Sequence, residues 1–213
     1  MLPRAAARWP FRRDALPWTL GSLAPIISSW TLQFHHGRHY ADLVDSANRH
    51  VSDRLVLEGK SALEIMRWAR DENDADLYFA AAETLNHGFY WKSLTPKRKR
   101  PRDSLRVAMD RVYGDYATFA HELVLEGSRV VGSGWLWLVA DRRGVPRILS
   151  TLNADTPLAT GMTCLLGIDL WEHAYYADHQ HRRREYLEAV IDRRLDWDFA
   201  QRQYQAASLG LPC

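Results

Sequence analysis

Apolar and aromatic positions in the first 95 residues recur at intervals of three and four, which is the period of an amphipathic helix. Three such stretches are present, at residues 28–51, 61–70 and 74–94. The alternation of apolar and polar residues that marks a half-buried strand is almost absent from this half. We therefore predict that residues 14–95 form a helical lobe built around an antiparallel hairpin.

Residues 95–102, TPKRKRPR, end this pattern with two prolines and five basic residues. Proline lacks the amide hydrogen that a helix interior needs, and its ring clashes with the preceding turn. We place a linker between two lobes at residues 96–102. A basic run is also typical of nuclear localisation or nucleic-acid binding, but a solvated linker is the favoured interpretation.

The second half of the chain mixes helical and strand patterns. Three short apolar runs lie between helical stretches, and residues 141–144, DRRG, suit a hairpin turn between the first two runs. The ranges, in chain order, are helices 104–113 and 115–126, strands 135–140, 147–151 and 164–168, and helices 183–194 and 198–207. The predicted fold is α+β: an N-terminal α-helical hairpin lobe, then an α/β lobe over residues 103–213 with a small three-stranded antiparallel sheet.

The composition limits which binding partners and which cellular compartment we expect for the protein. Lysine and arginine total 28 against 26 for aspartate and glutamate, a formal net charge of +2, so neither nucleic acid nor a membrane is indicated as a partner. No apolar run approaches the ~20 residues that span a bilayer. Two cysteines, Cys164 and Cys213, make no disulfide framework, which suits a cytoplasmic protein. Residues 1–13 hold four arginines and no acid; we interpret them as a short N-terminal extension, with organelle targeting as the lesser alternative.

Two titratable residues lie directly after the third predicted strand. Asp169 comes after that strand, and His173 lies four residues later in the aromatic stretch DLWEHAYY. Residues four apart on a helical turn point toward one spot, as two metal ligands from one segment do. In the alternative, Asp169 caps a helix and His173 is a satisfied core histidine. The segment alone leaves these alternatives evenly balanced.

Histidines in the long predicted helices favour the metal. His35 and His39 lie one turn apart in QFHHGRHY, and His87 lies in the aromatic stretch ETLNHGFYW. If the helices form a hairpin and the second lobe packs across it, one histidine from each helix can meet Asp169 and His173. Three imidazoles and a carboxylate suit iron, manganese, zinc or copper better than calcium or magnesium.

These motifs resemble the iron/manganese superoxide dismutase family. The matching segments are ALPWTLGSLAPIISSWTLQFHHGRH, NHGFYW, GSGWLWLV, STLNADTPL and DLWEHAYY, in that order, over nearly the whole chain. The resemblance implies the same two lobes, with one iron or manganese ion per subunit between them. It makes His35, His87, Asp169 and His173 the metal ligands, with solvent as the fifth. The implied reaction converts superoxide to dioxygen and hydrogen peroxide by one-electron cycling of the metal.

The same resemblance implies a homodimer. His39 and Tyr176 correspond to a pair that bonds across the dimer interface, and Glu172 to a residue that reaches the ligand histidine of the other subunit. A carboxylate bonded to the far nitrogen of a ligating imidazole fixes its tautomer and raises its basicity. Pairing of dimers into tetramers stays open.

Further residues are assigned to the surroundings of the metal by resemblance. Tyr90, Trp135 and Trp171 match the aromatic shell that limits water near the ligands. Arg38 and Arg183 match positions whose positive charge lines the approach of the superoxide anion, and such charge accelerates the encounter of a small anion with its site.

Two positions depart from the family pattern. Leu43 stands where the family usually has a tyrosine that gates the channel and relays protons, which predicts impaired proton delivery with metal binding intact. Glu83 replaces the glutamine that controls the metal-bound solvent, and Ala154 stands at the alternative glutamine position. Glu83 has three interpretations: protonated, it mimics the glutamine; ionised, it favours the oxidised metal and suppresses turnover; or it turns away from the site.

Iron is the expected metal, because Ala81, Ala82 and the run FYW resemble the iron subgroup, whereas Asp155 resembles the manganese one. The leading hypothesis is a superoxide dismutase. The alternatives are a metal-binding, redox-accessory protein with weak or lost dismutase activity, and a scaffold on the same fold. A scaffold is disfavoured, because it has no reason to keep three imidazoles and a carboxylate facing one another in a buried site.

Overall fold

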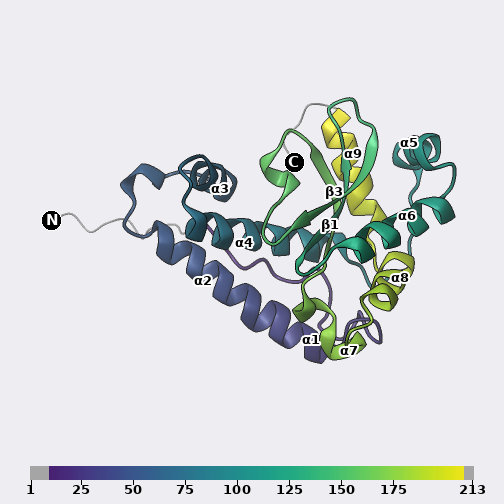
Figure 1. The fold of residues 1–213 in the computed structure, drawn as a ribbon, viewed down its shortest axis with the longest axis horizontal. Coiled ribbons are helices and arrows are strands. Elements are labelled where there is room, and N and C mark those ends of the chain that lie inside the picture. Colours follow the sequence, from purple (N-terminus) through teal and green to yellow (C-terminus); the bar gives the residue numbers. More distant parts are fainter. Residues whose placement is uncertain (1–9, 209–213) are drawn as a thin grey trace.

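A computed structural model describes residues 10–208 of the 213-residue chain, in two lobes (Figure 1). Most of the predicted N-terminal extension, and Cys213, lie outside the described residues. The first lobe is helical, and the second combines helices with a three-stranded antiparallel sheet, so the predicted fold class is confirmed. Within residues 10–208, no helix is long and apolar enough to cross a bilayer.

The helical lobe is centred on one long buried helix. Its elements are α1 (Ser29–Phe34), a π-helical turn (His35–His39), α2 (Tyr40–Val51), a 3-10 turn (Leu55–Leu57), α3 (Ala62–Asp71) and α4 (Ala75–Ser93). Ser28, Ser61 and Asp74 cap helix starts by accepting hydrogen bonds from backbone amides of the first turn. α4 packs against both α2 and α3 and is buried along most of its length.

The first predicted helix is continuous but contains an irregular turn. The π-helical turn over His35–His39 widens the helix by one residue, a feature that is frequent at functional sites. The ring centroid of His39, at the end of this turn, lies 4.2 Å from that of His173 in the second lobe and 5.1 Å from that of His87 in the first. Apolar periodicity does not reveal such a turn, because the flanking helical pattern is unbroken.

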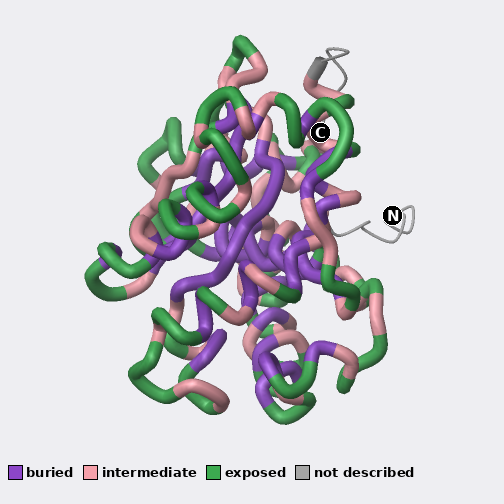
Figure 2. Tube along the Cα trace, turned by 90° about the vertical axis from the view of Figure 1, so that its right-hand side faces the viewer, coloured by how far each residue is buried: buried purple, intermediate pink, exposed green. Residues whose placement is uncertain are grey.

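The second lobe surrounds a sheet with strand order β2–β1–β3. Its elements are α5 (Asp103–Tyr113), α6 (Tyr116–Arg129), β1 (Gly134–Ala140), β2 (Pro146–Leu152), β3 (Thr163–Asp169), α7 (Tyr176–His179), α8 (Arg183–Arg193) and α9 (Trp197–Ser208), with 3-10 turns at Pro157–Ala159 and Glu172–Ala174. β1 is buried throughout, and α4 and α9 pack against β3. The buried backbone runs through the middle of the molecule (Figure 2). Trp135 on β1 pairs with Asp169 on β3, so the sheet carries that carboxylate to the junction of the lobes.

The basic segment after α4 keeps exposed side chains at Lys97, Arg98 and Arg102, and it also makes ion pairs with the second lobe. Arg98 lies 2.7 Å from Asp192, and Lys99 lies 3.0 Å from Asp196 and 2.7 Å from Asp198. These acids belong to α8, α9 and the turn between them. Ion pairs therefore hold the linker against the second lobe.

Candidate metal centre

The four predicted ligand residues meet at the junction of the lobes. His35 opens the π-helical turn and His87 lies on α4, while Asp169 ends β3 and His173 lies in the 3-10 turn that follows. One possible ligand atom from each residue lies within 4.8 Å of the other three. His35, His87 and Asp169 are buried, whereas the His173 side chain is 26% exposed. Each lobe thus supplies two of the four residues.

Asp169 is the centre of this cluster. Its Oδ2 lies 3.1 Å from Nε2 of His35, 3.1 Å from Nε2 of His173 and 3.6 Å from Nε2 of His87. Its Oδ1 accepts a hydrogen bond of 2.8 Å from the backbone amide of Trp171. This bond orients the carboxylate so that Oδ2 faces the three imidazoles.

The imidazole nitrogens of the cluster are arranged to bind a metal ion and not to hydrogen-bond one another. His87 Nδ1 lies 2.8 Å from the carbonyl oxygen of Glu83, which makes Nδ1 the donor and leaves the lone pair on Nε2. Within residues 10–208, Nε2 of His87 and Nε2 of His35 are buried without a well-aligned hydrogen-bond partner. Buried polar atoms are rarely left so. Three imidazole nitrogens and a carboxylate are a ligand set that suits iron and manganese.

Burial also sets the protonation of the cluster. It lowers the pKa of His35 to about 4 and that of His87 well below its ordinary value, so both imidazoles are neutral at pH 7. Burial by itself raises the pKa of Asp169, but His173 and His35 outweigh it and hold that pKa below its usual range. Neutral imidazole and ionised carboxylate are the forms that bind a cation.

Aromatic rings enclose the cluster, as the resemblance implied. Each of the three expected rings lies against a ligand histidine, with centroid distances of 5.7 Å for Tyr90–His35, 5.1 Å for Trp135–His87 and 5.8 Å for Trp171–His173. Tyr90 and Trp135 are fully buried. The role that the resemblance predicts for these rings is to limit water near the ligands.

Two more aromatic residues around the cluster were not predicted. The Trp91 ring lies 4.7 Å from the His35 ring, and the Tyr186 hydroxyl lies 3.0 Å from that of Tyr90. The run FYW could have indicated Trp91, which lies one helical turn after His87. Tyr186 comes from α8, about a hundred residues away, and no local pattern marks it.

Leu43 is buried on α2 and offers no hydroxyl. Nearby Tyr40 stacks on His87, with centroids 5.8 Å apart, and donates its hydroxyl to the carbonyl oxygen of Arg12 at 3.3 Å. A Cβ at Gly88 would lie 3.1 Å from that hydroxyl, so the glycine leaves the space that Tyr40 occupies. Tyr40 therefore supports His87 and does not replace the missing tyrosine.

Glu83 faces the cluster, which excludes the interpretation that it turns away. Nε1 of Trp135 donates to Glu83 Oε1 at 3.1 Å, and Oε2 lies 3.5 Å from Nδ1 of His87. Burial, and then the charge of Asp169, raise the pKa of Glu83 to about 9 despite the opposing hydrogen bond from Trp135. A protonated carboxyl can donate a hydrogen bond, as the amide of glutamine does.

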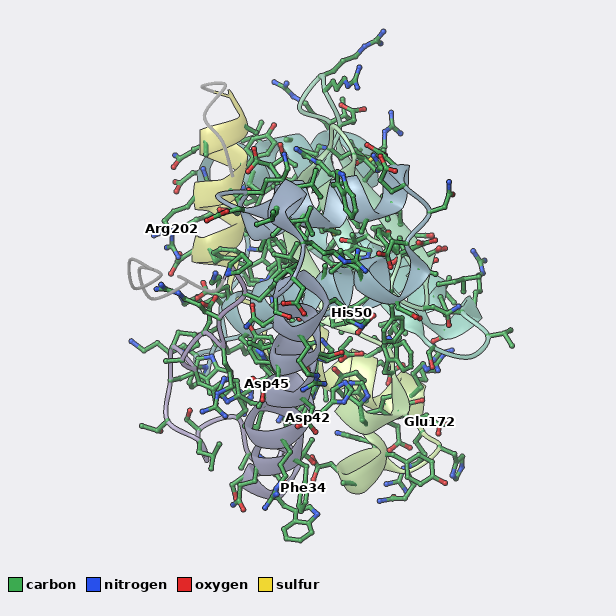
Figure 3. All side chains as sticks on the ribbon, turned by 90° about the vertical axis from the view of Figure 1, so that its left-hand side faces the viewer. Phe34, Asp42, Asp45, His50, Glu172 and Arg202 are labelled. Carbon is green, nitrogen blue, oxygen red and sulfur yellow. The ribbon has the colours of Figure 1, made fainter. Side chains whose placement is uncertain are left out.

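The residues expected at a dimer interface lie at the surface near His173. Glu172 is exposed, and Tyr176 is 51% exposed. On α1, Trp30 and Phe34 form an exposed aromatic pair with ring centroids 4.7 Å apart. Figure 3 looks onto the side of the molecule where Phe34 and Glu172 lie.

The two arginines expected along the substrate approach differ in their surroundings. Arg38 is exposed on the π-helical turn. Arg183 is half-buried and donates to the carbonyl oxygens of Val130 at 2.5 Å and Gly132 at 2.6 Å, and to the hydroxyl of Tyr175 at 3.1 Å. Its guanidinium thus fastens the loop before β1 to the start of α8.

Fold and site together define a two-lobed protein with a mononuclear centre of three histidines and one aspartate. Models of the iron/manganese superoxide dismutases match both lobes: the alpha-hairpin domain over residues 10–95 and the C-terminal domain over residues 101–203. The chain belongs to the iron/manganese superoxide dismutase family.

Its relatives match it over most of their length. The superoxide dismutase (Fe) of Synechococcus elongatus is 40% identical over 199 residues, which is 92% of this chain and 98% of the relative. That of Legionella pneumophila is 36% identical over 89% of this chain and 96% of its own. The superoxide dismutase (Mn/Fe) of Rickettsia bellii is 32% identical over 91% of this chain and 92% of its own.

Proposed function

We propose that this protein converts superoxide to dioxygen and hydrogen peroxide at one iron ion per chain, held by His35, His87, Asp169 and His173. The observation that carries this function is the convergence of three imidazoles and one carboxylate, two from each lobe, in a site enclosed by aromatic rings. Two of the three relatives compared are named for iron and the third for manganese or iron. Iron is therefore the favoured metal, and manganese is the alternative.

A bound iron or manganese ion supplies the one-electron couple with which one superoxide is oxidised to dioxygen and a second, with two protons, is reduced to hydrogen peroxide. The protein supplies the ligands and the surroundings of the metal. The neutral imidazoles of His35 and His87 and the ionised Asp169 provide a net single negative charge for a cation. The rings of Tyr90 and Trp135 keep bulk water away from these ligands.

Proton handling is where this chain differs from the family pattern. Oε1 of Glu83 accepts from Trp135, which leaves Oε2 as the carboxyl atom next to His87. Nδ1 of His87 is itself a donor to the backbone carbonyl of Glu83, so a protonated Glu83 would donate to solvent at the metal, as the family's glutamine does. Leu43 provides no hydroxyl, so proton delivery is slower while metal binding is kept. The alternative of a redox-accessory protein without dismutase activity is not favoured, because relatives that are 36–40% identical over most of this chain are named superoxide dismutases.

We also infer that the working unit is a homodimer. The exposed Glu172 and Tyr176 lie beside the partly exposed His173, as the family's interface requires. The exposed rings of Trp30 and Phe34 add apolar area to the same end of the molecule, and exposed apolar patches of this kind are typical of interfaces.

The experiment that tests the function compares wild type, His87→Ala and His121→Ala. His121 is an exposed histidine on α6 and serves as the control. We expect about one iron or manganese ion per wild-type and His121→Ala chain, and superoxide removal by both. His87→Ala should lose metal and activity together. A wild-type protein that binds metal without dismutating superoxide would contradict the proposal in favour of the redox-accessory alternative.

A further inference from the structure

Asp178 lies on α7, five residues after His173, and connects the two lobes. Its Oδ2 accepts a hydrogen bond of 2.9 Å from the backbone amide of Ser28 and another of 2.7 Å from the hydroxyl of Thr31. Ser28 caps α1, and that helix leads directly to His35. α1 and α7 lie side by side at one end of the molecule (Figure 1).

A second contact runs beside this one. Nε2 of His179, the last residue of α7, lies 2.8 Å from the carbonyl oxygen of Ile26. Thr31 is 3% exposed, so its hydrogen bond with Asp178 is shielded from water on the helix side. Asp178 accepts two hydrogen bonds from the first lobe and His179 makes one, which makes Asp178 the larger of the two contacts.

The position of His173 depends on such contacts, because its own segment is short. His173 lies in a 3-10 turn of three residues and is followed by an α-helix of four. Segments of this length have too few internal hydrogen bonds to hold their place alone. His35, its counterpart from the other lobe, comes four residues after Thr31 on continuous helix. Asp178 therefore joins the segments that carry one ligand from each lobe.

We propose that Asp178 is a positioning residue of the metal centre, a latch that holds the His173 segment against the start of α1 and so fixes the spacing of the ligands. This inference rests on the proposed metal site. Groups hydrogen-bonded directly to metal ligands change metal affinity by about 10–100-fold when mutated. Asp178 acts through the segment that carries His173, so the lower end of this range is expected. Loss of the latch should appear mainly as faster release of the metal.

Three variants separate the latch from general stability. Asp178→Ala removes the acceptor. Asp178→Asn should largely rescue it, because both donors reach the same oxygen and an amide oxygen can accept two hydrogen bonds. Asp141→Ala is the control: its Oδ1 accepts from the amides of Arg143 and Val145, both at 2.9 Å, in the β1–β2 turn within one lobe.

The readout is the rate at which purified, iron-loaded protein releases iron to an excess of chelator, with the melting temperature of each metal-free variant measured in parallel. We expect at least about tenfold faster release from Asp178→Ala, and release within about threefold of wild type from Asp178→Asn. Asp141→Ala should lower the melting temperature and leave release unchanged.

Thr31→Val removes one donor from the other side of the contact and should give an intermediate rate, which keeps the test valid if Asp178→Ala does not fold. Release at the wild-type rate from the Asp178 and Thr31 variants would overturn the latch and leave the metal site standing. So would equal acceleration by Asp178→Ala and Asp141→Ala. A wild-type protein that takes up no iron or manganese would overturn the proposed function itself.

Discussion

The indole of Trp135 donates a hydrogen bond to the carboxyl of Glu83, with 3.1 Å between Nε1 and Oε1, although the two residues belong to different lobes. Glu83 is 1% exposed and lies next to the ligand His87. A buried carboxyl group therefore lies directly beside the ligands of the proposed metal centre. Its protonation state therefore affects the stability of the folded protein as well as the chemistry of the site.

Replacing Glu83 by glutamine should make the metal-free protein less sensitive to alkaline pH. The pKa of Glu83 is raised from its ordinary 4.5 to about 9 by burial and by Asp169. Stability from such a group is fully present below its unfolded pKa and is lost as pH rises toward the folded one. We expect the advantage of Glu83→Gln over wild type to grow by at least about 1 kcal/mol between pH 5 and pH 9, measured by denaturant unfolding. The exposed Glu188→Gln should show no such trend, and an equal pH dependence of Glu83→Gln and wild type would contradict the prediction.

Introducing a tyrosine at Leu43 should raise turnover. The change restores a hydroxyl at the position where the family relays protons, and it touches none of the four ligand residues. We expect turnover on the order of tenfold faster, below the full effect of a positioned general acid, with the metal content unchanged. Leu43→Phe adds similar bulk without the hydroxyl and serves as the control. Equal turnover rates for the two variants would show that the missing hydroxyl does not limit turnover.

Gly88 and Tyr40 should be energetically coupled. A Cβ at position 88 lies 3.1 Å from the Tyr40 hydroxyl, while alanine is otherwise favoured over glycine inside a helix. Gly88→Ala should therefore be more favourable by about 1 kcal/mol in a Tyr40→Phe background than in wild type. The free energies of unfolding of the four proteins in this cycle measure the coupling, and an additive cycle would mean that the hydroxyl moves aside at no cost.

Arg194 should be a major contributor to the stability of the lobe junction. Arg194 is buried, and its guanidinium donates to the carbonyl oxygens of Leu23, Ala24 and Pro96, which belong to the first lobe and the linker. Arg194→Met would leave these acceptors without their donor, at a cost of about 2–4 kcal/mol in the free energy of unfolding. The neighbouring Arg193→Met, at an exposed side chain, should cost far less. Similar losses for the two variants would argue against this role.

Removing the Trp30 ring should weaken the proposed homodimer. Trp30 is 61% exposed in the single chain, and aromatic residues of this kind are frequent energetic centres of interfaces. We expect Trp30→Ser to raise the dimer dissociation constant by at least about tenfold, measured by sedimentation. Val56→Ser, at another exposed apolar residue, is the control. A wild-type protein that stays monomeric at high concentration would contradict the homodimer itself.

Much of the fold followed from patterns a few residues long. Apolar spacing located the main helices and all three strands to within a few residues, because amphipathic periods and turn residues act locally. The four ligand residues were recognisable because the metal needs particular side-chain types, and because their motifs resemble those of a known family. The π-helical turn at His35–His39 was not predicted, since an added residue leaves each flanking stretch helical and only shifts the phase between them.

The sequence by itself thus determined which segments are helix or strand and which residues were candidates for the metal. Only the tertiary structure decided how the remaining polar groups are used: Glu83 faces Trp135, Arg183 binds the loop before β1, the basic linker pairs with acids of α8 and α9, and Asp178 reaches α1. These contacts join residues about fifty to a hundred and fifty positions apart. Their geometry depends on how two lobes pack, and no local pattern of apolar and polar residues records that packing.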